Sequence, residues 1–257
     1  MSLSDKIRGK ELIQLIFDLL SSHTSIRKYK NSQLSKEQIS ELISVAQHAA
    51  SSHFVQAYSV VWVTDEQIKK KIGELSKNMI QMETAGAVLV CCVDFQRLHV
   101  AGLMNDTTIV TDSAENVLVG TADVAIFAQN LAIAAESKGY GICYIGGVRN
   151  KPTEISELLD LPERVFPVFA MTVGVPDEQH EVKPRLPVEA ILHENGYDSE
   201  KYHSLLSAYD KTMEEYYETR GSNQKSTNWT KSMADFLKVP RRTHIKGFLA
   251  SRGFTWK

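Results

Sequence analysis

The segment His23-Thr24-Ser25-Ile26-Arg27-Lys28-Tyr29 places an imidazole, two hydroxyls and a guanidinium within five residues. A planar guanidinium can bind two oxygens of a phosphate, while hydroxyls and backbone N–H groups bind the others. The segment follows an amphipathic stretch and precedes a second predicted helix. A phosphate-binding loop and an ordinary basic surface loop both fit this pattern.

Two more cations, Lys183 and Arg185, lie in the proline-containing stretch Lys183-Pro184-Arg185-Leu186-Pro187. A residue that precedes proline is pushed out of the helical region, so this stretch is expected to be an extended loop. If the fold gathers Arg27, Lys183 and Arg185, the three cations form a pocket for a monophosphate.

The adjacent glycines Gly146 and Gly147 follow a short predicted strand. Bare backbone would let a flat ligand lie against the chain, with N–H groups aimed at its ring atoms. A simple turn is the alternative, and the pattern fits both. A phosphate at one end and a flat ring at the other together suggest FMN.

Other motifs of catalysis and binding are missing from the sequence. It holds no G-x-G-x-x-G, no P-loop and no G-x-S-x-G. His193-Glu194-Asn195-Gly196-Tyr197 begins like a zinc-protease helix but has tyrosine in place of the second histidine. Cys91, Cys92 and Cys143 lack metal-ligand spacing, so we expect no metal site and interpret them as reduced core thiols of a cytoplasmic protein.

The composition predicts a globular protein with an ordinary core. The 257 residues are 43% apolar and 23% charged, with a net charge of -2. This balance argues against a nucleic-acid-binding protein that relies on bulk electrostatics. Glu11, Gln14 and Asp18 interrupt the apolar N-terminal run, which argues against a signal peptide. We expect no apolar stretch to approach the roughly 18 residues of a membrane span, and therefore no membrane partner.

Hydrophobic periodicity and punctuation residues predict alternating helices and strands. One helical face carries Leu12, Leu15, Ile16 and Leu19, and Ser35 with Gln38 forms a capping box ahead of the next helix. Gly139 is expected to end a long apolar helix, and Pro167 to lie at a sheet edge or a bulge. The predicted helices cover about 36–50, 65–74, 112–138, 152–159, 199–219, 231–237 and 243–251, and the predicted strands 58–63, 85–93, 142–145 and 165–175. This alternation predicts an α/β or α+β fold around a small mixed sheet.

Five motifs stand in register along the chain: His23-Thr24-Ser25-Ile26-Arg27, Tyr144-Ile145-Gly146-Gly147-Val148-Arg149-Asn150, Lys183-Pro184-Arg185-Leu186-Pro187, His193-Glu194-Asn195 and Tyr216-Tyr217-Glu218-Thr219-Arg220-Gly221-Ser222-Asn223. Together they resemble the motifs of the group A oxygen-insensitive NADPH nitroreductases, also called NADPH–flavin oxidoreductases. The similarity runs from about residue 15 to the C-terminus.

The resemblance implies an α+β nitroreductase-like fold, with a central mixed, mainly antiparallel sheet surrounded by helices. It implies a homodimer with each FMN at the subunit interface. We expect the long helix 112–138 to pack in the core and in part of the dimer interface. Residues 1–257 would form one domain, in which 199–257 is a helical extension on the NADPH and dimer side.

The resemblance also implies the site residues. Arg27, Lys183 and Arg185 would bind the FMN phosphate. The FMN-binding set is His23, Thr24, Ser25, Ile26, Arg27, Ser51, Ser52, Tyr144, Ile145, Gly146, Gly147, Lys183 and Arg185, in which Ser51 and Ser52 would reach the flavin of the other subunit. Arg220, with Lys225 as a helper, would bind the NADPH phosphates.

One position departs from the family pattern. The family has a glutamine that touches the flavin ring, and Met79 stands at the aligned place. Asn78 or Gln81 are the candidate substitutes. The loop 98–110 carries no feature that can be assigned.

The implied reaction has two halves: NADPH gives a hydride to FMN, and an acceptor then takes two electrons. The flavin carries this chemistry, so no side chain is predicted to be a nucleophile or a base. The implied acceptors are nitroaromatics, quinones and free flavin. The alternatives are a non-catalytic FMN carrier or sensor, and an FMN enzyme that fragments or dehalogenates its substrate.

Overall fold

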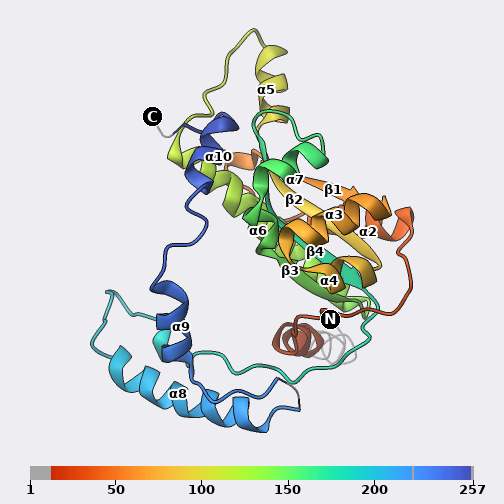
Figure 1. The fold of residues 1–257 in the computed structure, drawn as a ribbon. Helices are drawn as coiled ribbons and strands as arrows, with labels where there is room; N and C mark the ends of the chain where they lie inside the picture. The colour runs from red at the N-terminus through yellow and green to blue at the C-terminus, as the bar shows by residue number, and fades with distance from the viewer. Residues whose placement is uncertain (1–12, 222, 256–257) are drawn as a thin grey trace, which may run out of the picture. The chain divides into compact units, whose positions relative to one another are not determined.

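The computed structural model describes residues 13–221 and 223–255, and the chain folds into two compact units (Figure 1). The first unit comprises the chain up to His180 together with the residues from Arg242 onward, and the second comprises Glu181–Arg241. Each unit has its own hydrophobic core and is described by itself.

The first unit is built on a four-stranded sheet in the order β1-β2-β4-β3. Every neighbouring pair is antiparallel, and an isolated parallel bridge joins Ser25 to Ile142. The strands are β1 (Tyr58–Val63), β2 (Ala87–Asp94), β3 (Gly141–Ile145) and β4 (Val165–Gly174). The predicted α+β class with a mainly antiparallel sheet is therefore confirmed.

Strand β2 is buried along its whole length, as its continuous apolar run predicts. Adjacent residues of a strand point to opposite faces, and Cys91 and Cys92 accordingly join the two separate cores on either side of the sheet. Both thiols are free and buried, and burial raises the pKa of Cys91 to about 12. The prediction that these thiols are unpaired and lie in the core is confirmed.

Pro167 lies at a bulge rather than on an edge strand. The register between β2 and β4 shifts here, because Cys91 pairs with Phe169 while Cys92 pairs with Pro167. Strand β4 is central in the sheet, but β3 pairs only with its Ala170–Gly174 end. A proline without an N–H donor is therefore tolerated at this end.

The helices of the first unit surround the sheet, and most of them agree with the sequence prediction. In addition to a helix over 13–21, they are α2 (Lys36–Ala46), α3 (Glu66–Ser76), α4 (Met79–Thr84), α5 (Gln96–Leu103), α6 (Ala114–Ser137), α7 (Pro152–Leu158) and α10 (Ile245–Ser251), with helical turns at η1 (Ser52–Phe54) and η2 (Gly146–Asn150). The capping box at Ser35 is present, but α2 ends four residues before the predicted end. Helices α4 and α5 were not predicted, because both are short and lack a side-chain N-cap bond.

The long helix α6 packs against α2 and β2 and forms much of one core. It is 24 residues long and apolar enough to cross a membrane, so the prediction that no stretch approaches a span is wrong. In this structure 44% of its most apolar window is buried, as in a core helix. Gly139, with φ of 80°, follows the end of α6 and confirms the predicted stop.

The second unit contains η3 (Val188–Ala190), α8 (Tyr202–Thr219) and α9 (Trp229–Leu237). Tyr209, Met213 and Tyr217 form its small core, against which Leu186 and Trp229 pack. The stretch 181–187 is irregular, as its prolines predict.

Candidate functional site

The segment that carries Arg27 runs alongside β3. The backbone N–H of Ile26 donates to the carbonyl of Ile142 at 2.9 Å, and the hydroxyls of Tyr29 and Thr172 lie 2.8 Å apart. Ile26 and Tyr29 are buried, whereas the side chain of Arg27 is exposed. The buried Ile26 and Tyr29 thus anchor the segment, and the guanidinium of Arg27 between them is presented to solvent. The side chain of Ile26, which is predicted to line the cofactor, packs in the core and also lines a cavity.

A short contact directs His23 toward the end of α6. Its Nδ1 lies 2.5 Å from Oε1 of Glu136, and both side chains are partly buried. His23 and Thr24 line a cavity of about 420 Å³ together with Glu136, Glu178 and His180. Sequence reasoning did not find these acidic neighbours.

The carboxylate of Glu178 binds the backbone of Arg27 and Lys28. Its Oε1 accepts the backbone N–H groups of Arg27 at 2.5 Å and of Lys28 at 3.2 Å, and it lies 3.0 Å from His180. Although burial favours the neutral acid, the Arg27 N–H and His180 hold the pKa of Glu178 below its ordinary value. These two N–H groups are therefore already bound to a carboxylate. A phosphate here would depend on the side chains of the segment.

Gly147 has no room for a side chain. A Cβ at this position would lie 2.3 Å from the carbonyl oxygen of Ser76 and 2.6 Å from Nδ2 of Asn78. Close packing of η2 on the turn between α3 and α4 thus requires the glycine, which is the simple-turn interpretation. At Gly146 a Cβ would meet only the end of the Arg149 side chain, at 3.3 Å. Gly146 is the position where the backbone could be bare toward a ligand.

The two residues before Gly146, which are also predicted to bind the ring, differ in burial. Ile145 is buried in the core. Tyr144 is half-buried and packs edge-to-face on Phe169, with ring centroids 5.0 Å apart. Of this pair, Tyr144 is the side chain that a ligand could contact.

The turn after α3 holds both candidates for the missing glutamine. Asn78 Nδ2 donates to the carbonyl of Ser76 at 2.7 Å, and Gln81 Nε2 donates to Asn78 Oδ1 at 3.3 Å. Asn78 lies directly beside Gly147. Of the two candidates, Asn78 is the one in contact with η2.

Ser51 and Ser52 are both bound to one buried carboxylate of α6. Ser51 Oγ donates to Asp123 Oδ2 at 2.7 Å, and the backbone N–H of Ser52 donates to Asp123 Oδ1 at 3.1 Å. Only 1% of Asp123 is exposed. The side chain of Ser52 is exposed, whereas the side chain of Ser51 is partly buried and makes hydrogen bonds within the turn.

In the second unit two predicted ligand-binding cations meet on one aromatic ring. Lys183 Nζ lies 5.3 Å from the centroid of the Tyr217 ring, and Arg220 Cζ lies 4.9 Å from it. Arg220 also donates to the carbonyl of Asn223. Its Nε is buried and has no hydrogen-bond partner in the described part of the chain. Lys225 is exposed, and its backbone N–H bonds to the carbonyl of Tyr217 at 3.3 Å.

The predicted phosphate cations are divided between the two units. Arg27 belongs to the first unit, and Lys183 and Arg185 belong to the second. Their convergence on one phosphate stays a prediction. Among the residues that the structure describes, neither these three nor Arg220 and Lys225 form an ion pair.

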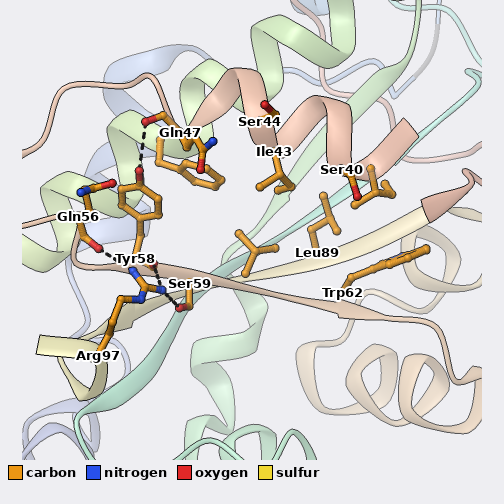
Figure 2. A pocket seen from close by; sticks show the side chains of 13 residues that line it. Ser40, Ile43, Ser44, Gln47, Gln56, Tyr58, Ser59, Trp62, Leu89 and Arg97 are labelled. Atoms are coloured by element: carbon orange, nitrogen blue, oxygen red, sulfur yellow. Dashed lines mark hydrogen bonds between the residues drawn. The ribbon is translucent and has the colours of Figure 1, made fainter. Parts of the chain in front are cut away.

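A second cavity, of about 570 Å³, contains none of the predicted site residues (Figure 2). It lies between α2 and β1 and has an apolar floor with a rim of serine hydroxyls and glutamine amides. Arg97 stands at one end, where it donates to the carbonyls of Gln56 and Tyr58, each at 3.2 Å.

Comparisons with known proteins assign the chain to a family. The Nitroreductase family model matches residues 20–175, and the model of the nitroreductase family C-terminal domain matches 183–257. A CR(VI) reductase of Pseudomonas sp. (strain G-1) is 63% identical, over 95% of this chain and 100% of its own. The structure of B. megaterium NfrA1 matches with a TM-score of 0.90 at 40% identity, covering 93% of this chain and 99% of that one. The NADPH:FMN oxidoreductase of Vibrio harveyi, complexed with NAD+, matches with a TM-score of 0.85 at 35% identity, covering 94% and 99%.

The chain therefore belongs to the nitroreductase family. It is an oxidoreductase, and the predicted cofactors, FMN with NADPH as the reductant, are confirmed with the family. The assignment of individual residues to FMN and NADPH stays a prediction.

The residues of the structure fit these cofactors. Phosphate groups need cationic or N–H donors that are not already neutralised. The exposed guanidinium of Arg27 and the unpartnered Nε of Arg220 are such donors. An anionic oxygen bound to Arg220 would satisfy a buried donor that lacks an acceptor within the described residues.

Proposed function

We propose that this protein is an FMN-dependent NADPH oxidoreductase that reduces nitroaromatics, quinones or free flavin by a two-step, ping-pong transfer of two electrons. FMN, when bound, supplies the hydride chemistry, accepting a hydride from NADPH and passing two electrons to the acceptor. The residues of the chain bind and orient the cofactor and both substrates.

The observation that carries this proposal is the pair of cations on the Tyr217 ring. A ring face attracts Lys183 and Arg220 without neutralising them, so their charge stays available to an anion. The buried Arg220 Nε adds a donor without an acceptor in the described chain. Such a site suits the phosphates of NADPH or FMN.

In this proposal Arg27, Lys183 and Arg185 bind the FMN phosphate, and His23, Thr24 and Ser25 line the same end. Tyr144 and Gly146 lie along the flavin ring, near Asn78. Arg220 and Lys225 bind the phosphates of NADPH. These assignments follow the family pattern residue by residue.

The active form is proposed to be a cytoplasmic homodimer. Helix α6 keeps large apolar side chains exposed outside the core, with Leu118 at 66% and Ile126 at 43% exposure. A partner subunit that covers them would bring its Ser51 and Ser52 to the flavin of the first subunit.

Cr(VI) is a second candidate acceptor. The relative that is 63% identical along almost the whole chain is named a CR(VI) reductase. The flavin donor proposed here would serve an oxyanion as well as an organic acceptor.

The purified chain should be yellow or should become yellow on adding FMN. Anaerobic NADPH should bleach the bound flavin rapidly, and nitroaromatic, quinone, flavin or chromate should restore the colour. Bound flavin that NADPH does not bleach would identify a carrier or sensor. A chain that takes up no FMN would contradict the proposal as a whole.

A further inference from the structure

The turn between α2 and β1 is held in a strained shape. His53, Phe54 and Gln56 have φ angles of 46°, 59° and 50°, in the left-handed region that non-glycine residues seldom adopt. Each such residue is strained relative to the right-handed or extended backbone. The surrounding structure must therefore fix the turn, since it would otherwise relax.

Asp123 of α6 provides one anchor. Its buried carboxylate accepts the N–H of Ala57 at 3.0 Å, in addition to the Ser51 hydroxyl and the Ser52 N–H. Ser51 Oγ in turn accepts the N–H of Gln56 at 2.7 Å. The three neutral donors that bind this carboxylate all come from the two ends of one turn. A buried carboxylate is costly without such bonds, so carboxylate and turn stabilise each other.

Arg97 provides a second anchor at the other end of the turn. Its Nη1 donates to the carbonyl of Gln56, and its Nη2 donates to the Ser59 hydroxyl at 2.7 Å (Figure 2). Asp94 pairs with the same guanidinium at 3.3 Å. The turn that holds the strained His53, Phe54 and Gln56 is thus fixed by both anchors, while the side chains of His53 and Phe54 remain exposed.

We propose that Asp123 is a positioning residue for FMN binding: it sets the shape of the turn 51–57, so that the exposed side of Ser52 faces the flavin. The inference rests on the proposed function, in which the turn of one subunit contacts the flavin of its partner. A rigid turn lowers the entropy lost when the cofactor binds.

The test compares FMN dissociation constants of the full-length protein and its variants. We expect Asp123→Asn to weaken FMN binding about tenfold, the factor that one lost hydrogen bond of ordinary strength gives. In a background that already carries Ser51→Ala and Ser52→Gly, Asp123→Asn should add less than about twofold, because coupled residues are not additive. Leu131→Ala, a fully buried change on the same helix, is the matched control. It should lower the melting temperature yet keep FMN affinity within about twofold of wild type.

An Asp123→Asn protein that binds FMN like the wild type would overturn the inference and leave the proposed function intact. If Asp123→Asn lowered FMN affinity equally with and without Ser51 and Ser52, the inference would also be overturned, because Asp123 would then act through general stability. If the wild-type protein binds no FMN, the inference and the proposed function are both contradicted.

Should Asp123→Asn fail to fold, Arg97→Lys tests the same turn from its exposed side. A weaker affinity for FMN, with hydrogen exchange accelerated in residues 51–57, would support the inference. Unchanged affinity would overturn it.

Discussion

Two regions hold their cations in different ways. One is the segment 23–29 of the first unit, which carries Arg27, and the other is the cluster of Lys183 and Arg220 on the Tyr217 ring of the second unit. Arg27 extends from a chain pinned to β3, and Glu178 already binds the adjacent backbone N–H groups. Lys183 and Arg220 instead lie over an aromatic ring. A carboxylate offsets nearby positive charge, whereas a ring face orients a cation and leaves its charge in place. The comparison indicates a rigid site in the first unit, where a carboxylate partly offsets the positive charge. In the second unit the positive charge of the site is not offset.

The largest expected effects come from removing the phosphate cations. Arg27→Ala or Arg185→Ala should weaken FMN binding by about 1.5–3 kcal/mol, the range of a lost charge-assisted hydrogen bond. Fluorescence titration with FMN measures the change. Unchanged affinity in both variants would remove the phosphate assignment from both units.

The packing of the first unit can be tested at Gly146 and Gly147. Gly147→Ala should destabilise the fold by about 1–3 kcal/mol through overpacking, because its Cβ would lie 2.3 Å from the Ser76 carbonyl oxygen. Gly146→Ala is the control, since its Cβ would meet only a flexible arginine end. Urea unfolding of the two variants compares them, and equal stability would contradict the packing role of Gly147.

The uncompensated charge of the second region predicts selectivity between nicotinamides. Arg220→Ala should raise the KM for NADPH about tenfold and the KM for NADH less, because only NADPH carries the additional phosphate. FMN should stay bound. An equal rise in KM for NADPH and NADH would show that Arg220 does not bind that phosphate.

The smallest effect concerns Glu178. Since the pKa of Glu178 in the folded protein lies below its ordinary value of 4.5, its bonds stabilise the fold above that pH. The contribution should be lost as the pH falls through the folded pKa. Glu178→Gln should therefore flatten the dependence of the melting temperature on pH between about 5 and 3. It should also tighten FMN binding slightly, by removing negative charge beside Arg27. An unchanged pH profile would show that Glu178 does not titrate with folding.

Much of the fold follows from local sequence signals. The capping box at Ser35, the apolar run of β2 and the helix stop at Gly139 all act within a few residues, and the structure contains each of them. Helices α4 and α5 escaped prediction because they are short and weakly capped, so tertiary packing rather than local pattern determines them.

The site was less predictable because its chemistry depends on distant contacts. Nothing near Arg27 in the sequence shows that Glu178 will bind its backbone. Likewise, Asp123 follows Ser51 by 72 positions, and only the folded chain brings the two together. Gly147 was assigned equally to a turn or a ligand, and the proximity of Ser76 favours the turn.

The central claim is that Arg27, Lys183 and Arg185 bind the phosphate of FMN. Comparing FMN with riboflavin, which has the same ring system but no phosphate, tests this most directly. We expect wild type to bind FMN at least about 100-fold more tightly than riboflavin, as two charge-assisted bonds would give, and Arg27→Ala to lower this preference by about tenfold or more. Equal affinities of wild-type protein for FMN and riboflavin would contradict it.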